Sequence, residues 1–321
     1  MEPPTNLNEP VFFFTHHWEL MWLYPIIKKT GWPIIYVSDT IQQICDDLGF
    51  KTITEEEAQS HTKLIITVQH FTPQRERVDH WTATGGQVYV IQHAWDSILA
   101  LQDEFWSAHM NSFTKMLVCC TQDDEWLSQK YRGKIFLTGS PRLAMINEVK
   151  IMDLSDIYEK VGTKDFFVAT PPLGGFHSDT VYNMFYRDLP TLTQSKIVYK
   201  IHPSGDLNGL KAQYPQFFFW QDSRTDPYDT YKLVMASHGL VTASSFLGIE
   251  ATLMDKPVIL MGDLMEEEYQ RQEWQHQRER LPRDISSTLA KPEITSKQKE
   301  VKNWYKYDDT SLDNVIKEVL E

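Results

Sequence analysis

The sequence predicts two doubly wound α/β domains in tandem, and three observations lead to this prediction. The chain has 321 residues, enough for two domains of about 150 residues each. Short apolar runs alternate with helical patterns, which is typical of parallel sheets covered by helices. The alternation restarts near the middle of the chain. We therefore expect one domain over residues 1–150 and a second over residues 151–321, with the last helix able to pack back on the first domain.

Six short runs rich in β-branched and aromatic residues predict the strands of the first domain. They are Val11–Phe14, Ile34–Val37, Leu64–Val68, Val88–Ile91, Met116–Cys120 and Ile135–Leu137. Continuous apolar runs of this kind are expected where both faces of a sheet are buried. Helical patterns lie between the runs, at Trp18–Lys28, Ile41–Leu48 and Asp124–Tyr131.

The second half of the chain repeats this organisation. Its expected strands are Phe166–Ala169, Ile197–Ile201, Phe217–Trp220, Gly239–Thr242 and Pro257–Met261, and its expected helices include Thr180–Leu189 and Tyr228–Ser237. Residues 266–283 are dense in Glu, Gln and Arg and predict a solvated helix, and residues 309–321 predict a final amphipathic helix. Ligands of doubly wound sheets bind outside the carboxyl ends of the strands, so we expect the chemistry in the loops that follow them.

Net charge, cysteine content and the length of apolar runs argue against several classes of protein. A net charge of −13 disfavours a broad electrostatic grip on nucleic acid, which needs surplus Lys and Arg. The chain has three cysteines, two of them adjacent, which argues against a disulfide framework, and no Cys/His spacing predicts a zinc site. The first ten residues lack the pattern of a signal peptide, and no apolar run approaches the ~20 residues of a membrane span. We therefore expect a cytoplasmic protein.

The most informative stretch runs from Gly239 to Gly262. A strand is expected to end at Thr242 and a helix to begin near Ser244, which places the hydroxyls of Ser244 and Ser245 and free backbone N–H groups where an anion can bind. Glu250 is expected two turns into this helix, within reach of ribose hydroxyls. The plainer interpretation is that one serine caps the helix, which does not exclude phosphate binding.

Two further segments are expected near this anion site. His202, in Lys-Ile-His-Pro, closes a strand and can donate to a phosphate oxygen. Gly174 and Gly175 follow the first strand of the second domain, where glycine lets the backbone approach a ligand closely. Neither a dinucleotide-binding fingerprint nor a P-loop occurs in the sequence.

Taken in order, these motifs resemble the GT-B glycosyltransferase group over roughly residues 135–265. The closest likenesses are CDP-glycerol glycerophosphotransferases and the capsule and sialic-acid-type transferases, and more distantly UDP-N-acetylglucosamine 2-epimerases. The resemblance implies two Rossmann-like domains facing across a cleft. It also implies that the nucleotide phosphates are held by His202, Ser244 and Ser245 and the ribose by Glu250.

The first domain contains the candidate acceptor side. The segment at residues 87–96 is similar to the Gln-His-Gly segment of these enzymes, in which the histidine is a proposed general base; here it is His93, and Ala94 replaces the glycine. Asp96 is expected either to orient His93 or to be the base itself. A packed or capping histidine is the alternative. The other acceptor-side candidates follow expected strands: His16, His17, His70 and Arg75. For the segment around Arg75, a solvated charged loop is the alternative.

These predictions favour a metal-independent glycosyltransferase with no cofactor beyond a nucleotide-activated sugar or polyol phosphate as co-substrate. The acceptor would be a glycan, a polymer or a nucleic acid. Three alternatives stay open: a nucleotide-sugar 2-epimerase or hydrolase, a phage-type DNA-base glycosyltransferase, and a non-catalytic nucleotide- or glycan-binding module. Phe246-Leu247-Gly248, in place of the epimerase glycines, counts against the first, and the acidic charge balance counts against the second.

Overall fold

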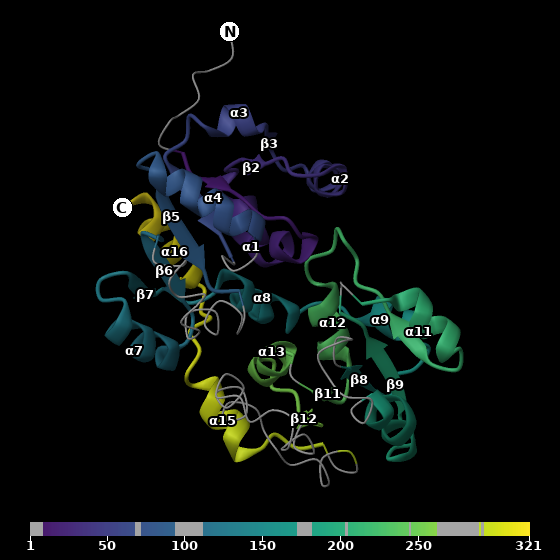
Figure 1. Cartoon of the computed structure of the whole chain (residues 1–321). Helices are drawn as coiled ribbons and strands as arrows, with labels where there is room; N and C mark the ends of the chain where they lie inside the picture. Colours follow the sequence, from purple (N-terminus) through teal and green to yellow (C-terminus); the bar gives the residue numbers. More distant parts are fainter. Residues whose placement is uncertain are drawn as a thin grey trace. The chain divides into compact units, whose positions relative to one another are not determined.

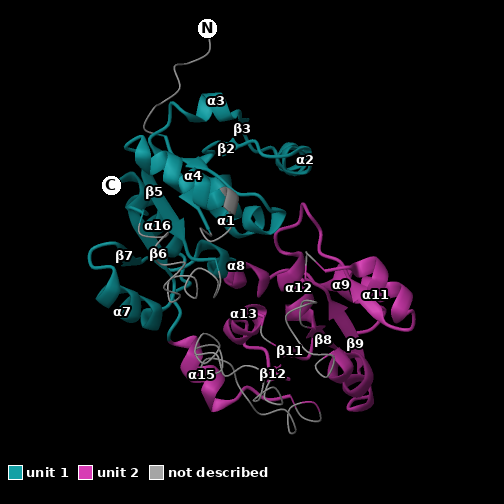
Figure 2. Ribbon diagram, in the orientation of Figure 1, with its two compact units in different colours: residues 1–145, 304–321 teal, residues 146–303 magenta. Residues whose placement is uncertain are grey.

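The computed structural model describes residues 9–67, 72–93, 112–171, 182–202, 205–243, 245–261, 289 and 292–321. The chain divides into two units, Met1–Met145 with Trp304–Glu321 and Ile146–Asn303 (Figure 2). The last eighteen residues thus lie with the first unit rather than continuing the second. The element order is shown in Figure 1.

The first unit is built on a seven-stranded sheet in which every neighbouring pair of strands is parallel. The strand order is β3-β2-β1-β4-β5-β6-β7. The strands are β1 (Val11–Phe12), β2 (Ile34–Ile35), β3 (Thr52–Ile53), β4 (Lys63–Ile66), β5 (Gln87–Ile91), β6 (Lys115–Val118) and β7 (Ile135–Leu137). The edge strand β3 was not predicted, because its two residues are too short for an apolar run.

Both faces of this sheet are buried, because successive side chains point to opposite sides. Val11, Leu64 and Val88 pack on the face covered by α3 (Glu55–Ala58), α4 (Thr72–Ala83) and α7 (Thr121–Lys130). Phe12 and Ile65 pack on the other face, which is covered by α1 (His17–Thr30), α2 (Asp39–Leu48) and α16 (Ser311–Leu320). The final helix was expected at residues 309–321, and the structure confirms it.

Lysines on two strands hold the end of α16 against the sheet. Lys63 Nζ donates to the carbonyls of Val319 and Leu320 at 2.7 and 2.9 Å, and Lys115 Nζ donates to the Glu318 carbonyl at 2.8 Å. A cation at a helix carboxyl end satisfies carbonyls that have no partner within the helix.

Within the described residues no helix is long and apolar enough to cross a membrane.

The second unit contains a smaller parallel sheet of order β10-β9-β8-β11-β12. Its strands are β8 (Phe166–Thr170), β9 (Lys196–Lys200), β10 (Phe218–Trp220), β11 (Leu240–Thr242) and β12 (Val258–Leu260). Its α-helices are α9 (Ser155–Val161), α11 (Leu207–Gln213), α12 (Asp229–Ala236), α13 (Leu247–Leu253) and α15 (Ser296–Lys302). The segment α8 (Pro141–Val149) crosses the boundary between the units.

Two expected helices of this unit differ in detail from the prediction. The described part of the segment expected to be helical over 180–189 is helical, but it contains a π-helical turn, Met184–Asp188, which is followed by a 3-10 turn, Leu189–Thr191. Pro190 cannot donate an α-helical hydrogen bond, and Tyr199 Oη donates to the Phe185 carbonyl at 2.8 Å. The helix expected from about Ser244 begins at Leu247.

The structure confirms the predicted α/β class with two doubly wound parallel sheets. In each sheet the strand order reverses once, between β1 and β4 in the first unit and between β8 and β11 in the second. Such reversal points are where doubly wound sheets bind ligands, outside the carboxyl ends of the strands. The candidate site residues are therefore located relative to these two edges.

Candidate functional site

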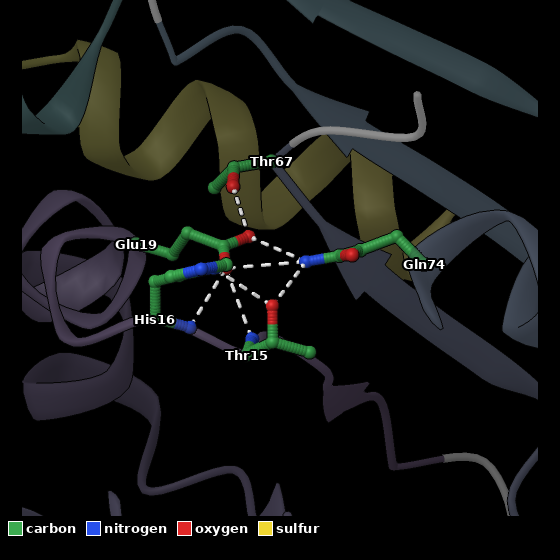
Figure 3. A network of polar contacts seen from close by, with 5 residues as sticks. All are labelled: Thr15, His16, Glu19, Thr67 and Gln74. Atoms are coloured by element: carbon green, nitrogen blue, oxygen red, sulfur yellow. Dashed lines mark hydrogen bonds and ion pairs between the residues drawn. The ribbon is translucent and has the colours of Figure 1, made fainter. Parts of the chain in front are cut away.

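A buried carboxylate lies at the reversal point of the first sheet. Glu19, in the first turn of α1, is fully buried, and its Oε2 accepts hydrogen bonds from the backbone N–H groups of Thr15 and His16 at 2.9 and 3.0 Å. Thr67 Oγ1 donates to Glu19 Oε1 at 3.0 Å, and Gln74 Nε2 lies 3.2 Å from Oε2 (Figure 3). Thr15 follows β1 and Thr67 follows β4, so Glu19 joins the two strands at the reversal.

His16 and His17 begin α1 beside this carboxylate. His16 is the N-cap residue; its ring is 46% exposed, and its Nδ1 lies 2.8 Å from Thr15 Oγ1 and 3.5 Å from Glu19 Oε2. His17 is the first residue of the helix and is half-buried. Of the two neighbours, His16 is therefore the one whose ring is open to solvent at this edge.

His93 follows β5 and packs against two tryptophans of α1. Its ring centroid lies 4.5 Å from that of Trp18 and 5.0 Å from that of Trp22, the second in an edge-to-face arrangement. Trp18 also stacks on His16 at 5.5 Å. Both candidate histidines, His16 and His93, thus contact the Trp18 indole at the carboxyl edge of the first sheet.

The backbone next to His93 is anchored by a buried polar network. Trp22 Nε1 donates to the Gln92 carbonyl at 2.9 Å. The Gln92 side chain donates to Asp123 Oδ2 at 2.9 Å and accepts the Cys119 backbone N–H at 3.0 Å. Gln92 and Asp123 are each 1% exposed. The network ties β5, β6 and α7 together, and it holds the chain where it leaves the strand for His93.

Arg75 lies on a helix and not in the charged loop that the sequence suggested. Residues 72–83 form α4, and Arg75 is half-buried on it. The neighbouring Arg77 pairs with Glu55, and its guanidinium lies 4.8 Å from the Phe13 ring centroid. Five other predicted site residues lie outside the described residues: His70, Asp96, Gly174, Gly175 and Ser244.

Hydroxyl groups gather at the reversal point of the second sheet. Thr170 and Thr242 end β8 and β11 and are aligned in register. Thr242 Oγ1 accepts the Ser245 backbone N–H at 3.2 Å, and Ser245 Oγ accepts that of Leu247 at 3.2 Å, so Ser245 shapes the turn into α13. The N-cap residue of α13 is Phe246, so Ser245 lies one residue before the cap. The buried Thr170 hydroxyl has no hydrogen-bond partner in the part of the chain that the structure describes.

His202 and an ion pair follow β9 at the same edge. The His202 side chain is exposed, two residues beyond the end of the strand. Lys200, the last residue of β9, pairs with Asp222 at 2.8 Å, and Asp222 accepts a hydrogen bond from Thr230 Oγ1 at 2.9 Å. These contacts link the ends of β9 and β10 to α12 and leave the imidazole exposed at the edge.

Glu250 lies closer to this edge than predicted. Because α13 begins at Leu247, Glu250 is in its first turn and not two turns along. Its side chain is buried, with 8% exposed, and its Oε1 accepts a hydrogen bond from Tyr231 Oη at 2.5 Å. The carboxylate therefore has a fixed direction at the start of the helix.

A second buried carboxylate supports the start of α12. Asp229 Oδ2 accepts hydrogen bonds from the Ser223 backbone N–H at 2.7 Å and from Trp220 Nε1 at 3.1 Å. Burial raises the pKa of Asp229 above its usual range, although the Ser223 hydrogen bond opposes the rise. These contacts give Asp229 a structural role at the first residue of α12. No cluster of three or more His, Cys, Asp or Glu side chains able to hold a metal ion occurs within the described ranges.

Sequence reasoning overlooked three residues that organise these edges. Glu19 carried one signal, an acidic residue in the first turn of an apolar helix, three positions after the N-cap. Gln74 and Tyr231 carried none, because their contacts join residues far apart in the chain.

No protein-family model and no curated protein matches the chain, whereas solved structures do. The S. aureus MnaA–UDP co-structure aligns with a TM-score of 0.69 at 12% identity, over 96% of this chain and 95% of that one. The UDP-GlcNAc 2-epimerase from Methanocaldococcus jannaschii has a TM-score of 0.61 at 12% identity, over 97% and 98%. The wall teichoic acid polymerase TagF has a TM-score of 0.63 at 12% identity, over 97% and 89%. The resemblance that the motifs indicated is therefore confirmed at the level of architecture: the chain has the GT-B fold.

Proposed function

We propose that the protein is a glycosyltransferase-type enzyme that moves a sugar or a polyol phosphate from a nucleotide-activated donor to an acceptor hydroxyl, without a metal ion. One observation carries the proposal. At the carboxyl edge of the second sheet, an exposed histidine, a serine at a helix start and a fixed carboxylate follow β9 and β11: His202, Ser245 and Glu250. These groups match the phosphates and the ribose of a nucleotide. The likeness in fold to MnaA, solved with UDP, supports the same assignment.

The second unit would bind the donor and stabilise the leaving group. The departing nucleotide phosphate carries negative charge, which backbone N–H groups, hydroxyls and a donating imidazole stabilise without reorganisation. Ser245 and the Thr170 hydroxyl lie at the reversal point for this purpose, and His202 is exposed beside them. Glu250 would accept hydrogen bonds from the ribose.

The first unit would activate the acceptor. An alcohol is a weak nucleophile until its proton is removed, and a histidine titrating near neutrality suits that task. His93 is half-buried, at the carboxyl edge, with its ring held by Trp18 and Trp22. We propose His93 as the base, with Asp96 as the alternative base or the residue that orients it, and His16 as an acceptor contact because its ring is exposed at the same edge.

A nucleotide-sugar 2-epimerase or hydrolase is the second candidate. The likeness in fold to the UDP-GlcNAc 2-epimerase from Methanocaldococcus jannaschii, at a TM-score of 0.61, favours it. An epimerase or hydrolase turns over a nucleotide sugar alone, whereas a transferase needs an acceptor hydroxyl other than water. Turnover of UDP- and CDP-linked donors with and without added glycan or polyol acceptors separates the two.

Nucleotide binding tests the assignment of the second unit. A nucleotide at a hundred times its Kd stabilises a protein by about 2.7 kcal/mol, so UDP, CDP, GDP and CMP can be screened by thermal unfolding. We expect at least one to raise the Tm, and His202→Ala and Ser245→Ala to reduce the shift. His238→Ala is the matched control, because His238 is also exposed but precedes β11, at the opposite edge of the sheet. A Tm unchanged by every nucleotide would contradict the proposal.

A further inference from the structure

A tyrosine and a glutamate from different helices meet inside the second unit. Tyr231 Oη donates to Glu250 Oε1 at 2.5 Å, and the two side chains are 0% and 8% exposed. Hydrogen bonds from a hydroxyl to a carboxylate are short and about twice as strong as neutral ones. One oxygen of the Glu250 carboxylate is therefore held by Tyr231.

Both residues lie in the first turns of helices that follow strands. Tyr231 is the third residue of α12, which follows β10, and Glu250 is the fourth residue of α13, which follows β11. The carboxyl ends of parallel strands share one edge of the sheet, so the hydrogen bond spans two neighbouring helix starts at the edge where a nucleotide is proposed to bind.

The helix start that carries Tyr231 is itself fixed. Asp229 accepts hydrogen bonds from Trp220 and from the Ser223 backbone, and Thr230 donates to Asp222. Asp222 in turn pairs with Lys200 at the end of β9. Tyr231 thus projects from a turn that is tied to the ends of β9 and β10, and its hydroxyl can hold a partner without moving itself.

We propose that Tyr231 is a positioning residue that fixes the Glu250 carboxylate for the ribose diol, so that the second unit selects ribonucleotides over deoxyribonucleotides. The inference rests on the proposed function. A diol gains its two hydrogen bonds only if the acceptor carboxylate already points at it, because orienting a free side chain on binding costs affinity. Because Tyr231 already orients the Glu250 carboxylate in the free protein, ordering this side chain does not reduce the affinity for the nucleotide.

A purely structural role predicts a different result. If Tyr231 only satisfies a buried carboxylate, then removing its hydroxyl lowers stability and weakens all nucleotides equally. If it positions Glu250 for the diol, then removal weakens ribonucleotides and leaves deoxyribonucleotides nearly unchanged. The ratio of the two dissociation constants therefore separates the interpretations.

The test is calorimetric binding of UDP and CDP and of their 2′-deoxy and 3′-deoxy forms. We expect the wild type to bind the ribonucleotide about tenfold more tightly than the deoxy forms, the value of one hydrogen bond to a charged group. In Tyr231→Phe we expect that ratio to fall towards one. Tyr199→Phe is the matched control, because Tyr199 is equally buried in the same unit and donates its hydroxyl to a backbone carbonyl; its ratio should equal the wild type's.

Three outcomes would contradict the proposed function or the role of Tyr231. A wild type that binds neither nucleotide contradicts the proposed function. A wild type that binds them without preferring ribose, or a Tyr231→Phe variant with an unchanged ratio, overturns only the role of Tyr231. Should Tyr231→Phe not fold, the double variant Tyr231→Phe/Glu250→Ala is compared with Glu250→Ala. Because Tyr231 is proposed to act only through the Glu250 side chain, which both variants lack, the two ratios should agree, and a lower ratio in the double variant would overturn the assignment.

Discussion

Trp18 and His93 lie ring to ring at the carboxyl edge of the first sheet, with centroids 4.5 Å apart and planes inclined by 36°. Trp22, one helical turn further along α1, meets the same imidazole edge-on. The orientation of the His93 ring is therefore set by a helix that begins at the reversal point of the sheet. The proposed role of His93 as a base therefore depends on these ring contacts.

This relationship predicts that Trp18 affects turnover without affecting donor binding. Trp18→Leu removes the ring that faces His93, and we expect turnover to fall by about ten- to hundredfold, since small misplacements of a reacting group cost this much. Trp18→Phe keeps an aromatic face and should lose less. The kcat of transfer and the Kd of the nucleotide measure the two effects. A lower nucleotide affinity with unchanged kcat would contradict this explanation.

Glu19 is predicted to be a large contributor to stability. Glu19→Gln keeps the shape but places an amide NH₂ among four hydrogen-bond donors, so we expect the free energy of unfolding to fall by about 2 kcal/mol. Glu57→Gln is the matched control, because Glu57 accepts similar bonds from Thr54 at an exposed helix start. Urea unfolding measures both. Equal losses at the two sites would show that burial of Glu19 adds nothing.

Most strands of the fold could be predicted from the local sequence pattern, because a buried parallel strand is a continuous run of apolar residues. Every run assigned to a strand overlaps a strand in the structure, although the bounds often differ, as in Val11–Phe12 for Val11–Phe14. The strand Thr52–Ile53 was not predicted, because two residues at the edge of a sheet do not form a recognisable apolar run. The start of α13 was placed too early because serines both cap helices and form turns.

The candidate site was only partly predictable, for a physical reason. Histidines at strand ends can be read from the sequence, and His16, His93 and His202 do follow strands of the two sheets. The contacts that orient side chains at these edges join distant segments: Glu19 meets Gln74 across 55 residues, and Tyr231 meets Glu250 across 19. Local patterns carry no information on such pairs until the fold brings them together.

The buried Asp229 predicts a pH dependence of stability. Burial raises its pKa in the folded protein, so the folded state holds this proton more tightly than the unfolded state does. Its contribution to stability is therefore complete below the unfolded pKa and is lost as the pH rises through the folded pKa. We expect the unfolding free energy of the wild type minus that of Asp229→Asn to fall as the pH rises above the unfolded pKa of an aspartate, which is about 4. A difference that is constant or rises with pH would contradict the direction of the shift.

Thr242 is predicted to set the shape of the turn at the proposed nucleotide site. Its hydroxyl oxygen accepts the Ser245 backbone N–H at 3.2 Å, and Ser245 in turn accepts that of Leu247, so the two bonds shape the chain between β11 and α13. Thr242→Val keeps the volume in a fully buried position but removes the acceptor.

We expect Thr242→Val to weaken UDP or CDP binding by about fivefold, near the net value of one neutral hydrogen bond, because the turn no longer holds Ser245 in place before the phosphate arrives. Thr242→Ser restores the acceptor and should restore most of the affinity, although it leaves a small cavity. Calorimetric Kd values for the two variants and the wild type measure this. Equal affinities of Thr242→Val and the wild type would mean that the turn is held without this hydrogen bond, and the start of α13 itself would then have to account for the proposed phosphate contacts.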